Sequence, residues 1–246
     1  MAQDNSKWAC QDLQHNFHNT LMLSRFLQGV VALFAPDYCL VCRAVGSVLC
    51  ERCRLSLTPQ AAHCYRCLRP SAHSLTCQRC SRRTRPVMLV SAAHYEGLAK
   101  DVVRFAKYQP SRSAARELAA ILAPHLPFLD RTNTLFVPIP TTAARRRERA
   151  FDQALEIARR LARFTGIECQ NALRRRGTSH QVGATRRDRF AHMKDAFTVS
   201  RPAEIRGKTI VLVDDVMTTG ATMEAAAKVV TRAGAARVIG VVFARA

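Results

Sequence analysis

The sequence lacks a long apolar run. Its longest candidate, residues 21–35, is interrupted by Arg25 and Gln28 and is shorter than the roughly 20 residues that a membrane-spanning helix needs. Apolar side chains in this stretch recur on one helical face, which predicts an amphipathic helix packed on its own domain in preference to one lying on a membrane. Residues 1–20 are polar, so we expect no signal peptide and a cytoplasmic protein.

Acidic residues are also scarce. The chain has 38 Lys and Arg against 18 Asp and Glu, a net charge of +20, and the excess is present both before and after residue 86. This balance favours polyanionic partners such as nucleic acid, phosphorylated metabolites or an anionic membrane face, although a basic solvated surface gives the same count. Aromatic residues make up only 7%, so arginine would carry much of any stacking on unpaired bases.

Cysteine, in contrast, is abundant. Eight of the ten cysteines form four Cys-x2-Cys pairs, which are Cys39/Cys42, Cys50/Cys53, Cys64/Cys67 and Cys77/Cys80. Two such pairs supply the four thiolates of a structural zinc site. The missing signal peptide argues against disulfides, and several pairs in series argue against a thioredoxin-like redox motif. We therefore predict a cysteine-rich double zinc ribbon that holds about two Zn²⁺ ions.

The spacing of the pairs leaves their connectivity open. Sequential pairing would place the first two pairs on one zinc ion and the last two on another, while crossed pairing is also compatible with the spacing. Cys10 and Cys169 lie outside the array and are expected to be plain thiols.

Strand and helix patterns alternate after a basic linker at residues 81–86. Strands are predicted at 87–94, 134–138, 209–213 and 237–243, and helices at 98–107, 114–126, 151–164 and from 223 onward. Strands separated by helices imply an α/β domain with a parallel sheet flanked by helices. The predicted organisation is an N-terminal extension with an amphipathic helix at 1–35, the zinc ribbon at 36–86 and the α/β domain at 87–246.

The most informative motif reads Ile210-Val-Leu-Val-Asp214-Asp215-Val-Met-Thr218-Thr219-Gly220-Ala-Thr222. A buried strand ends in two carboxylates, and a hydroxyl-rich turn leads into a helix, so the turn lies where α/β sheets bind their ligands. Backbone N–H groups at a helix start, together with threonine hydroxyls, suit a phosphate. The paired acids suit sugar hydroxyls or a magnesium ion. A phosphorylated ribose satisfies both requirements.

Two other interpretations of this motif fit the sequence less well. An apolar strand that ends in Asp-Asp also occurs in NTPases, but these need a Gly-x4-Gly-Lys-Ser/Thr loop between a strand and a helix. The only Gly-Lys-Thr, residues 207–209, precedes a strand and has Pro202 at the position of the first glycine. A purely structural turn would not require two acids and three threonines together.

The motif resembles the 5-phosphoribosyl-1-pyrophosphate (PRPP) signature of type I phosphoribosyltransferases. The resemblance implies a phosphoribosyltransferase-like fold for the α/β domain, with Asp214 and Asp215 holding the ribose hydroxyls. It also implies a PRPP-binding loop formed by Val216, Met217, Thr218, Thr219, Gly220, Ala221 and Thr222.

Over residues 36–246 the chain resembles the ComF family, a competence-associated group that joins a zinc ribbon to a phosphoribosyltransferase domain. The carriers are the cysteine array, Tyr95-Glu-Gly97 with Lys107-Tyr108, Arg147-Glu-Arg149-Ala-Phe151-Asp-Gln153, Gln181 with Arg187, and the acid-pair motif. Family members typically have Arg-Gly-Phe-Asn-Gln where this chain has Ala150 and Asp152. The resemblance implies a pyrophosphate loop at 145–153 and a mobile loop at 174–190. The further PRPP-binding residues that we expect are Lys107, Arg145, Arg147 and Arg149.

The favoured function is a PRPP-binding phosphoribosyltransferase that uses magnesium and acts in DNA uptake during natural transformation. The alternative is a non-enzymatic protein that handles single-stranded DNA and cooperates with DNA-uptake proteins, with PRPP as a ligand or regulator. An inactive regulatory homologue is a further possibility. DNA would contact the arginines near the last cysteine pair, which are Arg79, Arg82, Arg83 and Arg85.

Overall fold

The computed structural model describes residues 37–82, 85–108, 112–149, 151–176 and 196–246, with the side chains of residues 112 and 149 left out. The chain divides into two compact units, one up to Cys50 and one from Glu51 to Ala246. The domain boundaries at residues 35 and 86 stay predictions, and the helix predicted at 21–35 lies outside the described residues. No helix in the described part is long and apolar enough to cross a bilayer.

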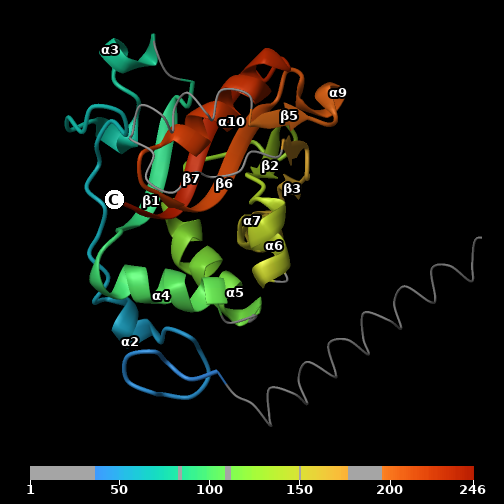
Figure 1. The fold of residues 1–246 in the computed structure, drawn as a ribbon. Helices are drawn as coiled ribbons and strands as arrows, with labels where there is room; N and C mark the ends of the chain where they lie inside the picture. The colour runs from blue at the N-terminus through green and yellow to red at the C-terminus, as the bar shows by residue number, and fades with distance from the viewer. Residues whose placement is uncertain (1–36, 83–84, 109–111, 150, 177–195) are drawn as a thin grey trace, which may run out of the picture. The chain divides into compact units, whose positions relative to one another are not determined.

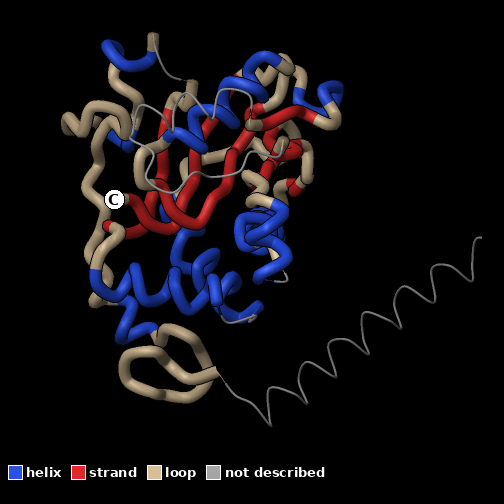
Figure 2. The backbone as a smooth tube through the Cα atoms, in the orientation of Figure 1, coloured by secondary structure: helices blue, strands red, loops and turns tan. Residues whose placement is uncertain are grey.

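The larger unit is built on a parallel five-stranded sheet with the order β1-β7-β6-β2-β3 (Figures 1 and 2). The strands are β1 (Met88–His94), β2 (Thr134–Pro138), β3 (Glu168–Cys169), β6 (Thr209–Met217) and β7 (Arg237–Arg245). Their side chains are mostly buried and apolar, as expected for parallel strands covered by helices on both faces. The parallel sheet predicted from the sequence is confirmed.

The main helices lie close to their predicted positions. They are α4 (Gly97–Tyr108), α5 (Arg112–Leu122), α7 (Gln153–Thr165) and α10 (Ala221–Arg232). Helix α5 ends before the predicted residue 126 and continues as the 3₁₀ turn η2 (Ala123–His125), because Pro124 has no N–H to donate. Helix α7 starts after Asp152, whose side chain accepts a hydrogen bond from the backbone N–H of Leu155 at 3.4 Å.

Side chains alternate between the two faces of the sheet. On one face, Leu89, Ile210 and Val242 join Ala226 and other residues of α10 in one buried apolar cluster. Gly240 of β7 lets α10 approach closely, since a Cβ atom there would lie 2.6 Å from Leu89 Cδ1 and 3.0 Å from Met223 Sδ. Helices α5 and α7 pack against each other and against the strands.

Strand β6 is longer than predicted. The expectation that it ends at residue 213 is wrong, because Asp214, Val216 and Met217 also pair with β7, opposite Val242, Ala244 and Arg245. The acid pair therefore lies within strand β6, near its C-terminal end, and not in the following loop. Pairing with β7 holds the backbone of this part of the strand.

Several short elements were not predicted. They are α6 (Ala143–Arg149), α9 (Pro202–Ile205) and the antiparallel hairpin of β4 (Leu173–Arg175) and β5 (Phe197–Val199). Among its described residues, the cysteine-rich part contains α2 (Glu51–Arg54), η1 (Ala72–Ser74), α3 (Gln78–Ser81) and isolated bridges such as His63–Pro70. Such short pieces depend on tertiary contacts more than on sequence pattern.

Candidate functional site

The candidate site lies where the strand order reverses. From β2 the chain moves outward to β3, and from the adjacent β6 it moves the other way to β7. A crevice at such a switch point is the ligand site of open α/β sheets. A cavity of about 260 Å³ is found there, lined by residues from several loops and helices. Its lining includes Tyr95, Lys107, Ile139, Pro140, Thr141, Arg145, Phe151, Asp152, Gln153, Arg175, Asp214, Asp215, Val216, Thr218 and Thr222.

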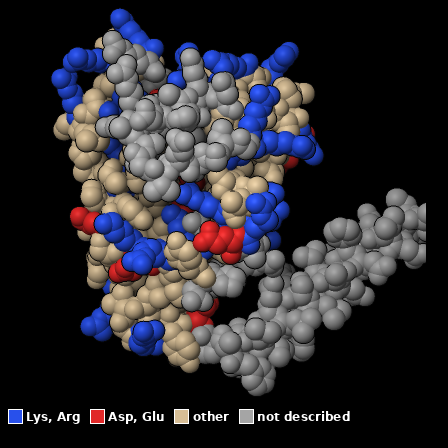
Figure 3. Space-filling view, in the orientation of Figure 1, with Lys and Arg blue, Asp and Glu red and all other residues tan. Residues whose placement is uncertain are grey.

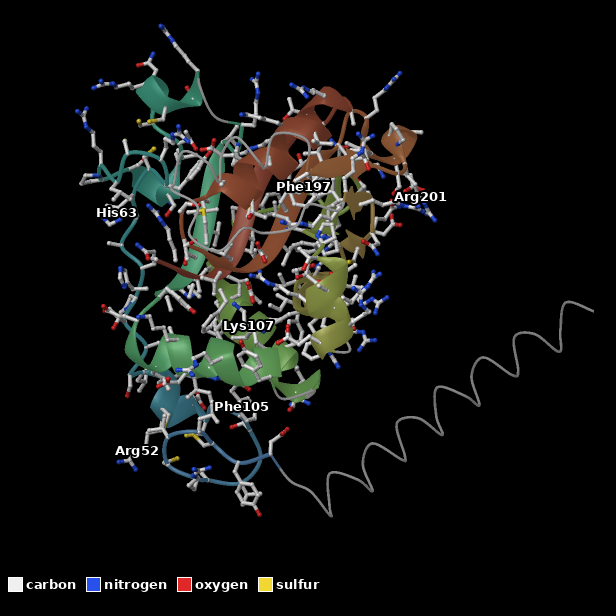
Figure 4. The ribbon with its side chains drawn as sticks, viewed as in Figure 1. Arg52, His63, Phe105, Lys107, Phe197 and Arg201 are labelled. Carbon is white, nitrogen blue, oxygen red and sulfur yellow. The ribbon has the colours of Figure 1, made fainter. Side chains whose placement is uncertain are left out.

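The acid pair is held rigidly by backbone hydrogen bonds. The N–H of Asp215 donates to Asp214 Oδ1 at 2.9 Å, and the N–H of Val216 donates to Asp215 Oδ1 at 2.7 Å. Burial, followed by the neighbouring charge of Asp215, raises the pKa of Asp214 well above its usual value. Lys107 Nζ lies 3.1 Å from Asp215 Oδ2 and points from α4 toward the sheet (Figure 4). The pair therefore favours ligands that donate hydrogen bonds or carry positive charge.

The turn after β6 has the form of a phosphate loop. Gly220 adopts φ +76°, a left-handed conformation that favours glycine, and it is the N-cap residue of α10. Because glycine has no side chain, no side-chain cap hydrogen bond forms from this position, and the first helical turn can present N–H groups to an anion. Thr218 and Thr222 line the cavity, whereas the Thr219 hydroxyl accepts the N–H of Ala221 at 3.4 Å and Met217 is buried in the core.

The cavity also has a cationic side. Arg145 from α6 and Arg175 from β4 both line it, and the Arg175 guanidinium lies 5.3 Å from the centre of the Phe197 ring. Burial, then the nearby charge of Arg145, lowers the pKa of Arg175. Arg147 is exposed and is not part of the described lining, and the side chain of Arg149 is not described.

Sequence reasoning missed several lining residues. Arg175 was predicted only as part of the mobile loop at 174–190, of which residues 177–190 lie outside the described residues, whereas the structure places Arg175 in the β4–β5 hairpin and in the cavity lining. Gln153 was quoted as a motif residue without a role. It is only 4% exposed, and neither polar atom of its side chain has a hydrogen-bond partner among the described residues. A buried amide left unpaired in a cavity is a candidate ligand contact.

The cysteines form two tetrads with the sequential connectivity. Cys39, Cys42, Cys50 and Cys53 make one group and Cys64, Cys67, Cys77 and Cys80 the other, with all Sγ atoms of a group within 4.8 Å of one another. A tetrahedral zinc site with Zn–S distances of roughly 2.3 Å has edges of about 3.8 Å. The Cys42–Cys50 and Cys67–Cys77 Sγ separations are 3.6 and 3.7 Å, so the geometry fits zinc.

Backbone groups prepare both tetrads for a cation. Burial raises the pKa of Cys39 and Cys64, but hydrogen bonds from backbone N–H groups outweigh it and lower each pKa to about 6. The same turn recurs in both tetrads, since the N–H of Arg43 donates to the Cys39 carbonyl and that of Leu68 donates to the Cys64 carbonyl. Cys39 and Cys64 are therefore available as thiolates at neutral pH, whereas burial raises the pKa of Cys80 to about 12.

A second cavity, of about 470 Å³, lies beside the second tetrad. It is lined by Arg66, Gln78, Arg79, Cys80 and Arg82. Arg79 and Arg82 were predicted to contact DNA, whereas Arg85 does not line this cavity and Arg83 lies outside the described residues. Lys and Arg side chains are also spread over the visible face of the larger unit (Figure 3).

Comparisons with known proteins agree with this geometry. A family model described as phosphoribosyl transferase domain matches residues 106–246. The DNA utilization protein YhgH of Salmonella typhimurium is 30% identical over 219 residues, which cover 84% of this chain and 96% of that protein. Competence protein F of Haemophilus influenzae is 28% identical over 195 residues, which cover 75% of this chain and 79% of that protein.

Among solved structures, the glutamine PRPP amidotransferase of B. subtilis aligns with 53% of this chain and 26% of its own, at 20% identity and a TM-score of 0.38, and this partial likeness supports no inference about function. The family model is the stronger finding, because it covers more than half of the chain and includes the strands and loops around the cavity. Together with the YhgH match and the tetrads, it shows that the chain belongs to the ComF family, whose members carry a phosphoribosyltransferase domain.

Proposed function

We propose that this protein is a magnesium-dependent phosphoribosyltransferase that uses PRPP and acts in DNA utilization. The observation that carries the proposal is the convergence of an acid pair, threonine hydroxyls and several cations on one cavity at the switch point of the sheet. The names of the relatives, a DNA utilization protein and a competence protein, support the wider role. We expect the reaction in the cytoplasm, where the thiols of the tetrads stay reduced.

The ribose and its 5-phosphate would occupy the β6 side of the cavity. The 5-phosphate would lie against Thr218, Thr222 and the open N–H groups at the start of α10. The ribose hydroxyls would donate to Asp214 and Asp215, which favours the ionised form that burial otherwise disfavours in Asp214. Binding energy from both ends of PRPP would thus fix its C1 atom in the cavity.

The pyrophosphate would lie toward Arg145 and Arg175, whose guanidinium groups match its oxygens. As the bond from C1 to pyrophosphate breaks, negative charge grows on the leaving group and positive charge on the ribose. The arginines would stabilise the negative charge on the leaving pyrophosphate, and the acid pair would stabilise the positive charge on the ribose. Magnesium, when bound with PRPP, would supply further positive charge to the pyrophosphate.

Pyrophosphate release tests the reaction. Wild-type protein with PRPP and magnesium is assayed alone and with a panel of nucleobases, amines and single-stranded DNA. We expect release that depends on one class of acceptor, and a loss of about 100-fold or more in Arg175→Gln because a leaving-group contact is removed. Arg201→Gln is the control, since Arg201 pairs with Glu204, is largely exposed and does not line the cavity; Figure 4 labels it at the outer edge of the side chains drawn around the sheet. Release that needs neither PRPP-site residues nor an acceptor would contradict the proposal.

Single-stranded DNA binding is a second proposal, and the arginine-lined cavity beside the second tetrad supports it. Phosphates would contact Arg79 and Arg82 with little sequence preference, so log affinity should fall with log salt at roughly −0.7 per phosphate neutralised. Arg79→Ala with Arg82→Ala should weaken binding and flatten this slope. Arg232→Ala with Arg237→Ala removes the same charge from exposed positions elsewhere and should change the slope less. If the two double variants weaken DNA binding equally, binding depends on the net charge of the protein and not on the arginines of this cavity.

A further inference from the structure

The second cysteine tetrad touches the phosphate loop of the larger unit. Tyr65 lies between Cys64 and Cys67 of the second tetrad and is only 6% exposed. Its ring carbons lie 3.9 and 4.0 Å from the position that a Cβ atom of Gly220 would take. The same ring belongs to the buried cluster that contains Met217. A residue of the cysteine turn therefore packs directly under the loop that follows β6.

Two polar contacts tie the same turn to helix α10 and to strand β7, the neighbour of β6 in the sheet. Arg66 pairs with Glu224 at 2.5 Å, and the Glu224 side chain in the first turn of α10 is only 5% exposed. Arg245, at the end of β7 opposite Met217, donates a hydrogen bond to the backbone carbonyl of Tyr65 at 3.3 Å. The cysteine turn therefore contacts the loop at Gly220, the helix that follows it through Glu224, and β7 through Arg245.

We infer that Tyr65 and Arg66 are positioning residues for PRPP, and that the metal held by Cys64, Cys67, Cys77 and Cys80 sets the affinity of the phosphate loop. This inference rests on the proposed PRPP site. The loop needs a left-handed Gly220 and open N–H groups, and a loop held in that conformation before binding loses less entropy when the ligand arrives. The cysteine turn contains little apolar core of its own, so its shape depends on the metal.

A matched pair of ion pairs allows a sharp test. Arg54 pairs with Glu117 at 2.5 Å, with side-chain exposures of 35% and 8%, against 37% and 5% for Arg66 and Glu224. Arg54 follows Cys53, and Arg66 lies between Cys64 and Cys67. The partner of Arg54, Glu117, belongs to α5, whereas the partner of Arg66, Glu224, belongs to α10, the helix that begins at the phosphate loop. Arg66→Ala should raise the Kd for PRPP with magnesium about tenfold or more, while Arg54→Ala should leave it within about twofold.

Tyr65 supplies the second arm. Its hydroxyl is buried without a hydrogen-bond partner among the described residues, so Tyr65→Phe keeps every contact made by the ring and should keep the PRPP affinity. Tyr65→Ala should lose affinity as Arg66→Ala does. Metal analysis accompanies each variant, and Cys77→Ser with Cys80→Ser should weaken PRPP binding more than Cys39→Ser with Cys42→Ser, which removes metal from the other tetrad.

Hydrogen exchange separates failure of this inference from failure of the proposed function. Amides of residues 219–224 should exchange faster in Arg66→Ala and Tyr65→Ala than in wild type, even without PRPP, and should be unchanged in Arg54→Ala. If wild type binds no PRPP, the proposed function fails while the exchange data still test the coupling. Unchanged exchange together with unchanged PRPP affinity in folded, metal-loaded Arg66→Ala and Tyr65→Ala would overturn the inference.

Discussion

At the scale of single residues, the cavity contains buried side chains that lower the stability of the folded protein. Asp214 is a carboxylate whose charged form is disfavoured by burial and by Asp215, and Gln153 buries an amide that pairs with nothing among the described residues. Neither feature helps the chain to fold. Both are explained by a ligand that supplies hydrogen-bond donors to the acid and partners to the amide.

Removing the Asp214 charge should stabilise the free protein in a pH-dependent way. Because its pKa is raised in the folded state, the wild type loses stability as pH rises from the unfolded value through the folded one. Asp214→Asn should therefore be more stable than wild type at pH 8, and this advantage should shrink as pH falls toward about 4. Urea unfolding of both proteins at each pH measures the difference. If Asp214→Asn is less stable than wild type at pH 8, the ionised Asp214 carboxylate does not destabilise the folded protein.

Gln153→Met should stabilise the free protein by about 1 to 3 kcal/mol, because a side chain of similar shape replaces an amide that is buried without partners. The same change should weaken PRPP or acceptor binding. Gln170→Met is the control outside the cavity, and it should stabilise the protein less, because Gln170 Nε2 donates to Glu168 Oε1 and only Oε1 of Gln170 is buried without a partner among the described residues. Unfolding midpoints and calorimetric titrations provide the readouts. Tighter ligand binding in Gln153→Met would show that the Gln153 amide does not contact the ligand.

At the scale of elements, the long periodic segments were predictable and the short ones were not. Residues 134–138 and the helix at 97–108 agree with their patterns, because burial on a parallel sheet demands continuous apolar runs and amphipathic faces. The β4–β5 hairpin and α6 are too short to show a period. Arg175 could therefore not be placed in the cavity from the sequence, whereas the acid pair could, because its motif is local.

Close packing between elements gives a testable consequence at Gly240. A methyl group there would meet Leu89 Cδ1 at 2.6 Å, so Gly240→Ala should cost about 1 to 3 kcal/mol in stability by forcing α10 or its neighbours to shift. Chemical denaturation measures this cost. Combined with Leu89→Val, the loss should be smaller than the sum of the single losses, since the atom that clashes is removed. If the losses of unfolding free energy in the two single variants simply add in the double variant, the strain does not come from the contact with Leu89 Cδ1.

At the scale of the whole molecule, the metal tetrads and the α/β domain should be separable in folding. Protein purified without added metal should contain about two zinc ions per chain. Cys64→Ser with Cys67→Ser should lose one of them, while near-native helix and strand content persists in the α/β domain. Elemental analysis and circular dichroism supply the data. Metal-free protein with four disulfides would contradict the zinc assignment.

The central claim is that the cavity at the switch point binds PRPP. The most direct measurement is the unfolding free energy with PRPP and magnesium at about a hundred times the dissociation constant, where mass action predicts a gain of roughly 2.7 kcal/mol. Asp214→Asn with Asp215→Asn should fold normally and show no gain, whereas Glu204→Gln, which alters the partly exposed Arg201–Glu204 ion pair outside the cavity lining, should show the wild-type gain. No stabilisation of wild type by PRPP at any concentration would contradict the account.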